Sequence, residues 1–397
     1  MHGQRMTMPR LLRTPFIATP LLCGLLLSAC ERSSTPAEPP VARGADQQGH
    51  AATAPSPDGL YGFTTSNHLS ATVAGAASLV YVPNLRSNTV SVIDPSQHEV
   101  IRTMPVGGGP QHVVPTFDLT RLWVTNNDGN SLTPIDPETG MSGEPVPVDD
   151  PYNLYFTSDG SLAMVMAETR HRVDFRDPVT MNLVTSMKVS CSGIDHMDFT
   201  ADGRFGIATC EYSGQLVKID LSARQPVAYL KLSGESMPQD IRVGPDGRTF
   251  FVADMAAGGL RVIDPTTFTE TGFIKTGVGT HGLVVGRGGS PWYVENRGWK
   301  SMARGRHGPG SITVVDPLGR KVLATWMVPG GGSPDMGNLS ADGKELWVSG
   351  RYDEEVYVFD VASGQMTHRI PVGKEPHGLC VWPQPGRFSL GHTGNMR

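Results

Sequence analysis

The sequence predicts an all-β protein, a seven-bladed β-propeller built from four-stranded antiparallel blades. Three observations lead to this prediction. The 397 residues include 47 glycines and 32 prolines, which mark many tight turns between short apolar runs. A short apolar segment that ends in aspartate recurs seven times. The chain also finishes on the first half of this repeat, in "EPHGLCVW", and not on a whole repeat.

The recurring segment ends one strand of each repeat. Its copies are spaced 41 to 44 residues apart, except for one interval of 52 residues. Units of this length, each with room for four short strands, are typical of propeller blades. The seven aspartates are Asp94, Asp136, Asp177, Asp220, Asp264, Asp316 and Asp360.

The order of elements within each repeat is constant. A turn with proline or glycine leads into a first strand such as "PQHVVPT". An Asp-Gly turn such as "TADGR" then favours a tight hairpin to a second strand such as "RLWVTN". The third strand ends in the aspartate, and a segment such as "MTHRIPVG" forms the fourth.

The incomplete final repeat predicts how the ring closes. The first repeat begins at "LVYVPN", residues 79–84, which is a second strand with no first strand before it. The segment "HGLCVW", residues 377–382, supplies the missing strand. We therefore expect the first blade to be assembled from both ends of the chain, which leaves no unpaired strand edge inside the ring.

The amino-terminal residues are predicted to be a leader and a tether. Basic residues precede an apolar run over residues 15–29, which is short for a membrane span. The run ends in "LSAC", which resembles a bacterial lipobox and would make Cys30 the lipidated first residue; the alternative is an ordinary signal with a chance cysteine. We expect a lipoprotein signal peptide at 1–29, a flexible tether at 30–60 and the propeller at 61–397.

These features predict an exported protein on the periplasmic face of a bacterial membrane, anchored through lipid alone. Removal of the signal takes away three arginines and no acids, which lowers the formal net charge from −5 to −8. This acidity argues against nucleic-acid binding. We expect a monomer that meets a small-molecule or protein partner in the cell envelope.

Polar residues recur where first strands start and where second strands end, and both positions lie at one rim of a propeller. Four histidines and two aspartates stand at the first kind of position, and two glutamates and an arginine at the second. The predicted ligand-binding residues of this mouth are His112, His196, Asp240, His281, Asp335, His377, Glu211, Glu295 and Arg351.

Three interpretations of this mouth remain open. The histidines His112, His196, His281 and His377 are candidate ligands of a transition metal, because imidazole and carboxylate suit Zn, Cu, Ni or Fe. The same array can instead bind a polar organic ligand. The residues can also simply satisfy strand-end backbone groups and line a water-filled channel. The cofactor is therefore unknown, with a transition metal as one candidate.

One insertion, at about residues 297–310, accounts for the long interval between repeats. It lies between the second and third strands of the sixth repeat and contains Arg297 and Trp299. We expect a basic aromatic arm over the mouth, suited to an anionic or planar ligand. The alternative is a surface loop whose charges stay solvated.

Cys191 and Cys210 flank the first two strands of one repeat. Antiparallel pairing about the turn "TADG" leaves them within about two positions of each other, which predicts a disulfide in an exported protein. Cys380 falls in the closing strand and is expected in the core. The absence of C-x-x-C-H from the sequence argues against covalently attached haem.

Residues 75–385 resemble a known repeat. The segments "YVPNLRSNTVSVIDPSQHEVIRTMPVG" and "WVTNNDGNSLTPIDPETG" are similar to the YVTN-type repeat of YncE-like exported β-propellers. Relatives in the wider group include the propeller that holds haem d1 in nitrite reductases and propeller lactonases. The tail "QPGRFSLGHTGNMR" resembles the ending of a lipoprotein subgroup.

The sequence favours a binding or scaffold protein that holds a small ligand, a metal or a protein partner at the mouth. The alternative is an enzyme, either a lactonase-like hydrolase that uses a pair such as His196 and Glu211, or a redox protein that carries a cofactor. No catalytic residue is assigned.

Overall fold

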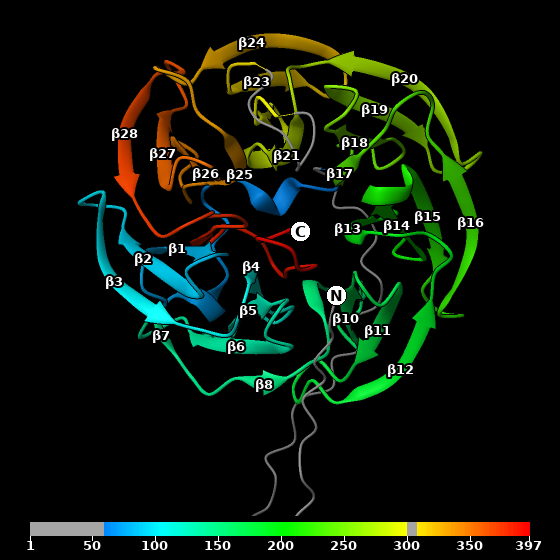
Figure 1. The fold of residues 1–397 in the computed structure, drawn as a ribbon, viewed down its shortest axis with the longest axis horizontal. Helices are drawn as coiled ribbons and strands as arrows, with labels where there is room; N and C mark the ends of the chain where they lie inside the picture. Colours follow the sequence, from blue (N-terminus) through cyan, green and yellow to red (C-terminus); the bar gives the residue numbers. More distant parts are fainter. Residues whose placement is uncertain (1–58, 300–307) are drawn as a thin grey trace, which may run out of the picture. The chain divides into compact units, whose positions relative to one another are not determined.

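The computed structural model describes residues 59–299 and 308–397, and within them the chain forms seven antiparallel sheets around a common centre (Figure 1). The predicted seven-bladed propeller is thereby confirmed. The predicted signal peptide, Cys30 and nearly all of the tether lie outside the described residues, as does the middle of the insertion. Among the helices that the structure does describe, none has the length and apolarity to cross a membrane.

The strands of each blade lie side by side, from the innermost to the outermost. Blade 1 contains β29 (Cys380–Trp382), β1 (Leu79–Asn84), β2 (Thr89–Asp94) and β3 (Glu99–Pro105). Blade 2 contains β4 (Pro110–Pro115), β5 (Leu122–Asn126), β6 (Ser131–Asp136), β7 (Met141–Ser142) and β8 (Val146–Pro147). Blade 3 contains β9 (Pro151–Phe156), β10 (Ala163–Ala167), β11 (Arg172–Arg176) and β12 (Leu183–Lys188).

The other four blades follow the same plan. Blade 4 contains β13 (Ile194–Phe199), β14 (Phe205–Cys210), β15 (Gln215–Asp220) and β16 (Gln225–Lys231). Blade 5 contains β17 (Pro238–Val243), β18 (Phe250–Asp254), β19 (Gly259–Asp264) and β20 (Thr269–Lys275). Blade 6 contains β21 (Thr280–Val285), β22 (Trp292–Asn296), β23 (Ser311–Asp316) and β24 (Lys321–Met327). Blade 7 contains β25 (Pro334–Leu339), β26 (Glu345–Gly350), β27 (Glu355–Asp360) and β28 (Met366–Pro371). Short 3-10 turns accompany these strands in the described chain: η1 (Gly62–Thr64), η2 (Ala71–Val73), η3 (Glu211–Ser213) and η4 (Arg287–Gly289).

Burial falls from the inner to the outer strand of each blade. Every residue of inner strands such as β4 and β13 is buried, whereas exposure alternates along outer strands such as β16. This pattern is expected of a sheet whose last strand has one face on the core and the other in water. The core lies between blades, where tryptophans such as Trp123 and Trp347 are buried among the apolar side chains of neighbouring sheets.

The recurring aspartates have a structural reason. The Asp94 carboxylate accepts a hydrogen bond of 2.8 Å from the backbone N–H of Ser96, and Asp264 accepts one of 2.7 Å from Thr266. Asp220 and Asp360 bind the backbone N–H three residues ahead, at Ala223 and Ser363. An aspartate that binds the backbone two or three residues ahead stabilises a tight turn, so each copy marks the turn after its strand. The repeat that identifies the fold is thus a turn signal.

The outer strand of blade 2 departs from the predicted four-strand pattern. It is broken into β7 and β8, both of which pair with β6. Pro134, Pro145 and Pro147 have no backbone N–H to donate, and a ladder with three such gaps is interrupted.

The terminal strand closes the ring as the sequence predicts. In β29, Val381 lies opposite Val80 of β1, and Cys380 lies opposite Tyr81. The strand is shorter than residues 377–382, because Gly378 leaves the sheet and bridges to His112 of blade 2 instead. Val381 and Leu379 pack against apolar side chains of blade 7, including Trp347.

The residues after β29 were not predicted to have a fixed place, yet they fold back into the centre of the ring (Figure 1). Gly391 bridges to Tyr155, and the Arg397 guanidinium donates a 2.8 Å hydrogen bond to Asp198. Both partners lie late in inner strands, at the end opposite the mouth. The tail, residues 384–397, therefore covers the far end of the channel.

Val381→Asp should lower the free energy of unfolding by more than about 3 kcal/mol, because it buries a charge in the strand that joins the two ends of the ring. Val184→Asp is the matched control, since Val184 is 52% exposed on an outer strand. Urea unfolding of both variants checks this. Equal loss of stability in the two would mean that β29 does not hold the ring closed.

Candidate functional site

A repeated β-bulge positions the channel residues. In five inner strands of the described chain, two residues oppose one residue of the second strand, as with the pair Asp195 and His196 opposite Thr209. The pairing lost there is replaced by a side chain, since Thr209 Oγ1 donates to Asp195 at 2.8 Å and accepts from the His196 backbone at 3.3 Å. A bulge re-aims side chains at a functional site. The five pairs are Gln111–His112, Asp195–His196, Gln239–Asp240, His281–Gly282 and Asp335–Met336.

Asp335 is the electrostatic centre of the channel. Its fully buried carboxylate forms ion pairs with Arg297 and, at 3.4 Å, with Arg351. Two histidines add contacts, His377 Nδ1 at 2.6 Å and His281 Nδ1 at 3.1 Å. Burial acts to raise the pKa of Asp335, but the nearby Arg297, His281 and His377 outweigh it and hold that pKa well below its ordinary value. Asp335 is therefore ionised in the folded protein.

His281 and His377 both contact the Asp335 carboxylate through Nδ1. His281 uses both ring nitrogens, because Nδ1 donates to the backbone carbonyl of Asp335 at 3.2 Å and Nε2 accepts from Arg297 at 2.7 Å. His377 donates from Nδ1 to Asp335, and its Nε2 lies 3.5 Å from the Tyr152 hydroxyl. Burial lowers the pKa of both imidazoles well below the ordinary value, so both are neutral.

His112 and His196 lie deeper and meet a third histidine, His392 of the tail. The His392 ring centroid is 5.2 Å from those of both His112 and His196. His392 Nε2 and His196 Nδ1 are 3.2 Å apart. Burial lowers the pKa of His112 to about 4 and moves the pKa values of His196 and His392 well below the ordinary one.

Five acids in the channel have raised pKa values, among them Asp240, whose pKa burial raises to about 6. Burial and the nearby Glu211 raise the pKa of Glu168 to about 7, and burial raises the pKa of Asp195 well above its ordinary value. Burial likewise raises the pKa values of Glu211 and Glu295. Neither carboxyl oxygen of Glu295 has a hydrogen-bond partner among the described residues. The channel thus favours protonated acids, which can donate hydrogen bonds.

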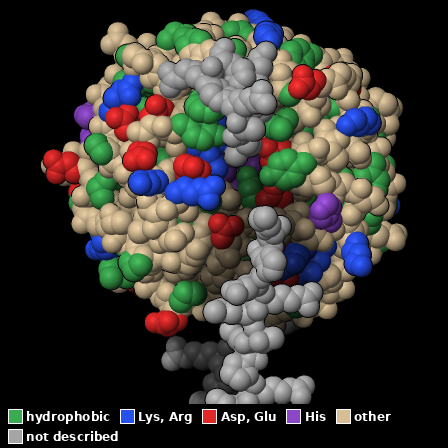
Figure 2. Space-filling view, viewed as in Figure 1, with side chains coloured by type: hydrophobic (Ala, Val, Ile, Leu, Met, Phe, Trp, Pro, Cys, Tyr) green, Lys and Arg blue, Asp and Glu red, His purple; other side chains and the backbone are tan. Residues whose placement is uncertain are grey.

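The mouth contains a cavity of about 300 Å³, within the range of small-ligand pockets. Figure 2 shows acidic, basic and histidine side chains around the centre of this face. The cavity is lined by Leu85, Arg86, Gln111, Asn127, Asp128, Tyr152, Glu168, Thr169, Glu211, Tyr212, Gln239, His281, Arg297, Arg351 and Glu375. Several buried polar atoms here have no hydrogen-bond partner in the described chain: Gln111 Oε1, Glu168 Oε1, Glu211 Oε1 and Arg351 Nε.

The predicted mouth residues divide into groups. Glu211, His281, Arg297 and Arg351 line the cavity together, and Asp335 and His377 lie behind them. Asp240 lies apart and forms an ion pair of 2.5 Å with Arg242. Glu295 packs closely against the backbone of Gly282. A Cβ atom added at Gly282 would lie only 2.7 Å from Glu295 Oε2. His196 and Glu211 share no hydrogen bond: His196 contacts Asn153 and His392, and Glu211 Oε1 has no hydrogen-bond partner among the described residues.

The predicted arm needs a correction. Arg297 does not overhang the mouth but is 1% exposed inside the channel, because the buried Asp335 carboxylate requires a cation beside it. Trp299 packs against Tyr352, with ring centroids 4.3 Å apart. Residues 300–307 of the insertion lie outside the described residues.

Sequence reasoning missed His392, Tyr152 and Arg242. His392 comes from the tail, which follows the last repeat and has no position in the repeat pattern. A dense run of polar and glycine residues after the final strand, "SLGHTGNMR", was the available signal. Outside the channel, Cys191 and Cys210 form a disulfide with an S–S distance of 2.11 Å, and Cys380 is a buried free thiol.

A model of the YNCE-like beta-propeller family matches residues 60–385. The chain belongs to this family. No curated protein sequence matches it. The family assignment covers the seven blades and β29 but not the tail that carries His392.

Solved structures similar to this YncE-like propeller share the fold at low identity. The hydrazine synthase of Kuenenia stuttgartiensis is 19% identical with a TM-score of 0.60, over 80% of this chain and 99% of that one. Dihydro-heme d1 dehydrogenase NirN, solved in complex with DHE, is 15% identical with a TM-score of 0.56, over 80% of this chain and 77% of that one. A functionally unknown protein of Desulfotomaculum acetoxidans is 15% identical with a TM-score of 0.61, over 77% of this chain and 99% of that one.

Glu168→Gln should stabilise this propeller at high pH only. Folded Glu168 has a pKa of about 7 against an ordinary 4.5, so its ionisation costs stability as pH rises between these values and the cost stays constant above them. The amide removes that cost, which amounts to at most about 3 kcal/mol. Urea unfolding at about pH 5 and about pH 8 measures the difference.

Glu144→Gln, at an exposed position, is the control and should leave stability unchanged at both pH values. An effect of Glu168→Gln that is equal at the two pH values would contradict the raised pKa.

Proposed function

We propose that this YncE-like propeller is an exported binding protein that holds a small polar carboxylate ligand in the mouth cavity. The observation that carries the proposal is the cavity of about 300 Å³ with Arg351 on one side and Glu168 and Glu211 on another. Export and a lipid anchor at Cys30 belong to the same proposal and are supported by the basic and apolar leader that ends in "LSAC".

The polar atoms of the cavity suit a carboxylate. Arg351 is 4% exposed on its side chain, and its Nε–H has no acceptor among the described residues. A ligand carboxylate would accept this hydrogen bond, and bonds of arginine to carboxylate are among the stronger ones in proteins. Glu168 and Glu211, whose pKa values are raised, can donate a proton to a ligand oxygen instead of repelling it.

The same geometry favours binding over hydrolysis. No serine or cysteine is among the described residues that line the cavity. His281, the histidine of the cavity wall, has both ring nitrogens bound by Asp335 and Arg297 and cannot act as a free base. The pair His196 and Glu211, the candidate for lactonase-like chemistry, shares no hydrogen bond. These observations support a cavity that holds its ligand without reacting with it.

Isothermal titration calorimetry with succinate, L-glutamate and gluconate tests the proposal. At least one of these carboxylates should bind, and Arg351→Gln should weaken its binding by ~30-fold or more because a buried charged hydrogen bond is lost. Gln111→Leu, which lies outside the Asp335 ion pairs, should weaken it by ~5-fold.

Arg248→Gln, on an exposed turn, is the control and should leave binding unchanged. Circular dichroism confirms that each variant is folded. The proposal fails if none of the three carboxylates binds the folded protein, or if Arg351→Gln binds the ligand as tightly as the wild type.

A further inference from the structure

A second cluster of polar groups lies in the channel beyond the mouth cavity. His112 of β4, His196 of β13 and His392 of the tail each place one ring nitrogen so that the three atoms lie within 4.8 Å of one another. A tetrahedral zinc ion with Zn–N bonds of 2.0–2.1 Å separates its ligand nitrogens by roughly 3.3 Å. Modest side-chain rotations would therefore bring all three nitrogens to one ion.

His112 already has the tautomer that a metal ligand needs. Its Nδ1 lies 3.0 Å from the carbonyl oxygen of Tyr152, which can only accept, so Nδ1 carries the proton. Nε2 then has a free lone pair, and this atom is buried without a hydrogen-bond partner among the described residues. Metal-binding histidines are typically oriented by such a bond from the other ring nitrogen. His196 Nε2 is likewise buried and unpartnered within the described chain.

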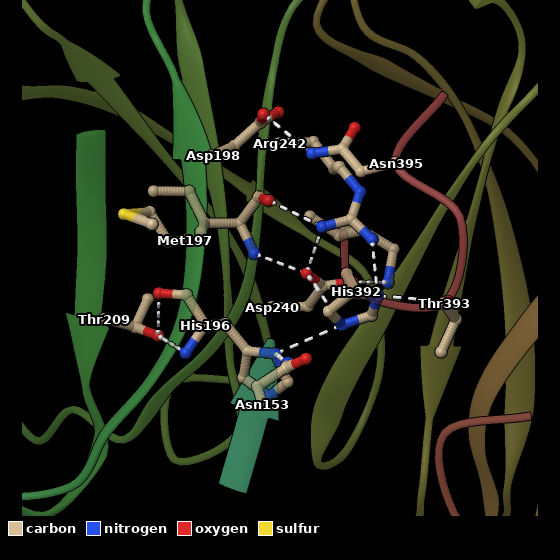
Figure 3. Close-up of polar contacts among 12 residues, drawn as sticks. Asn153, His196, Met197, Asp198, Thr209, Asp240, Arg242, His392, Thr393 and Asn395 are labelled. Atoms are coloured by element: carbon tan, nitrogen blue, oxygen red, sulfur yellow. Dashed lines mark hydrogen bonds and ion pairs between the residues drawn. The ribbon is translucent and has the colours of Figure 1, made fainter. Parts of the chain in front are cut away.

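His392 reaches the cluster from the far end of the channel, where its backbone N–H donates to the Leu154 carbonyl of β9 at 2.9 Å. In Figure 3 its ring points at His196, with Arg242 and Asp240 beside it. Arg242 Nη2 lies 3.2 Å from His392 Nδ1 and can only donate, so in the metal-free protein His392 carries its proton on Nε2. Metal binding at Nε2 requires the other tautomer, in which Nδ1 donates to Thr393 Oγ1, 3.0 Å away, in place of the Arg242 bond. The positive charge of Arg242 is offset by the ion pair of 2.5 Å with Asp240. Asp240 Oδ1 also lies 3.8 Å from His392 Nε2, which adds a negative charge near the cluster.

The chemistry of the three donors selects a class of ion. All three are buried imidazoles, a side chain that binds metal through a deprotonated ring nitrogen. Imidazole nitrogen suits Zn²⁺, Cu²⁺ and Ni²⁺, whereas Mg²⁺ and Ca²⁺ prefer oxygen ligands. Three protein ligands leave a further coordination position open.

We propose that His112, His196 and His392 form a binding site for a transition-metal ion of the Zn²⁺ class, completed by the C-terminal tail. The site differs from the four-histidine set predicted from the sequence, because His281 and His377 bind Asp335 and His392 takes their place. It also goes beyond the proposed carboxylate site, since none of its three ligands lines the mouth cavity.

Titration of the metal-free protein with ZnCl₂ and CoCl₂ tests this inference. One ion should bind per chain, and the Co²⁺ complex should show the intense visible absorption of a tetrahedral centre. His392→Ala should weaken Zn²⁺ binding by ~100-fold or more, because it removes one of three ligands. MgCl₂ should not compete for the site.

His368→Ala, at an exposed position, is the matched control and should bind Zn²⁺ like the wild type. His392→Gln provides a second variant if the alanine variant is unstable, and thermal unfolding with and without ZnCl₂ is measured for each. ZnCl₂ should raise the Tm of the wild type but not of the His392 variants. Stoichiometric Zn²⁺ binding that survives both His392 substitutions overturns the inference, as does a folded wild type that binds no Zn²⁺.

The outcomes separate the two proposals. Arg351→Gln should leave Zn²⁺ binding intact, and His392→Ala should leave carboxylate binding intact. If the wild-type protein binds only one of the two ligands, the site proposed for the other ligand has been wrongly assigned.

Discussion

The pairing of β29 with β1 is the constraint on which the rest of the molecule depends. It joins residues about three hundred positions apart in the chain and places the first blade against the last. It also brings two further segments into the ring, because His377 lies just before β29 and the tail follows directly after it. The mouth and the far end of the channel are therefore both completed by the last residues of the chain.

Burial decides the chemistry inside the closed ring. Because water is largely excluded, an unpaired charge there is costly, and charges are retained only where they are matched. Asp335 remains ionised because Arg297, Arg351 and two histidines surround it, whereas Glu168 and Asp195, which form no ion pair with any described residue, have raised pKa values. The imidazoles are neutral for the same reason. The channel thus presents hydrogen-bonding acids and an arginine at the mouth, and neutral nitrogen ligands deeper inside.

The sequence predicted the ring well and the site in part, for different physical reasons. Blades recur because each repeats the same turn chemistry, such as the Asp94 carboxylate on the next turn, so spacing alone identifies them. Residues at equal positions of successive repeats necessarily meet at one rim, which is why His281 and Arg351 both line the mouth cavity. The direction of each side chain is set by a β-bulge and by its hydrogen-bond and ion-pair partners. The spacing of the repeats carries no information on either the bulges or the partners. His392 lies after the last repeat, where only the folded tail shows its position.

Anomalous X-ray diffraction at the zinc absorption edge, from crystals of the full chain grown with ZnCl₂, tests the central claim most directly. If closure through β29 brings the tail into the channel, the map will show one strong peak in contact with His112, His196 and His392, with β29 paired to β1. A map with zinc only on exposed histidines such as His68 or His368, or with the tail outside the ring, would contradict the account.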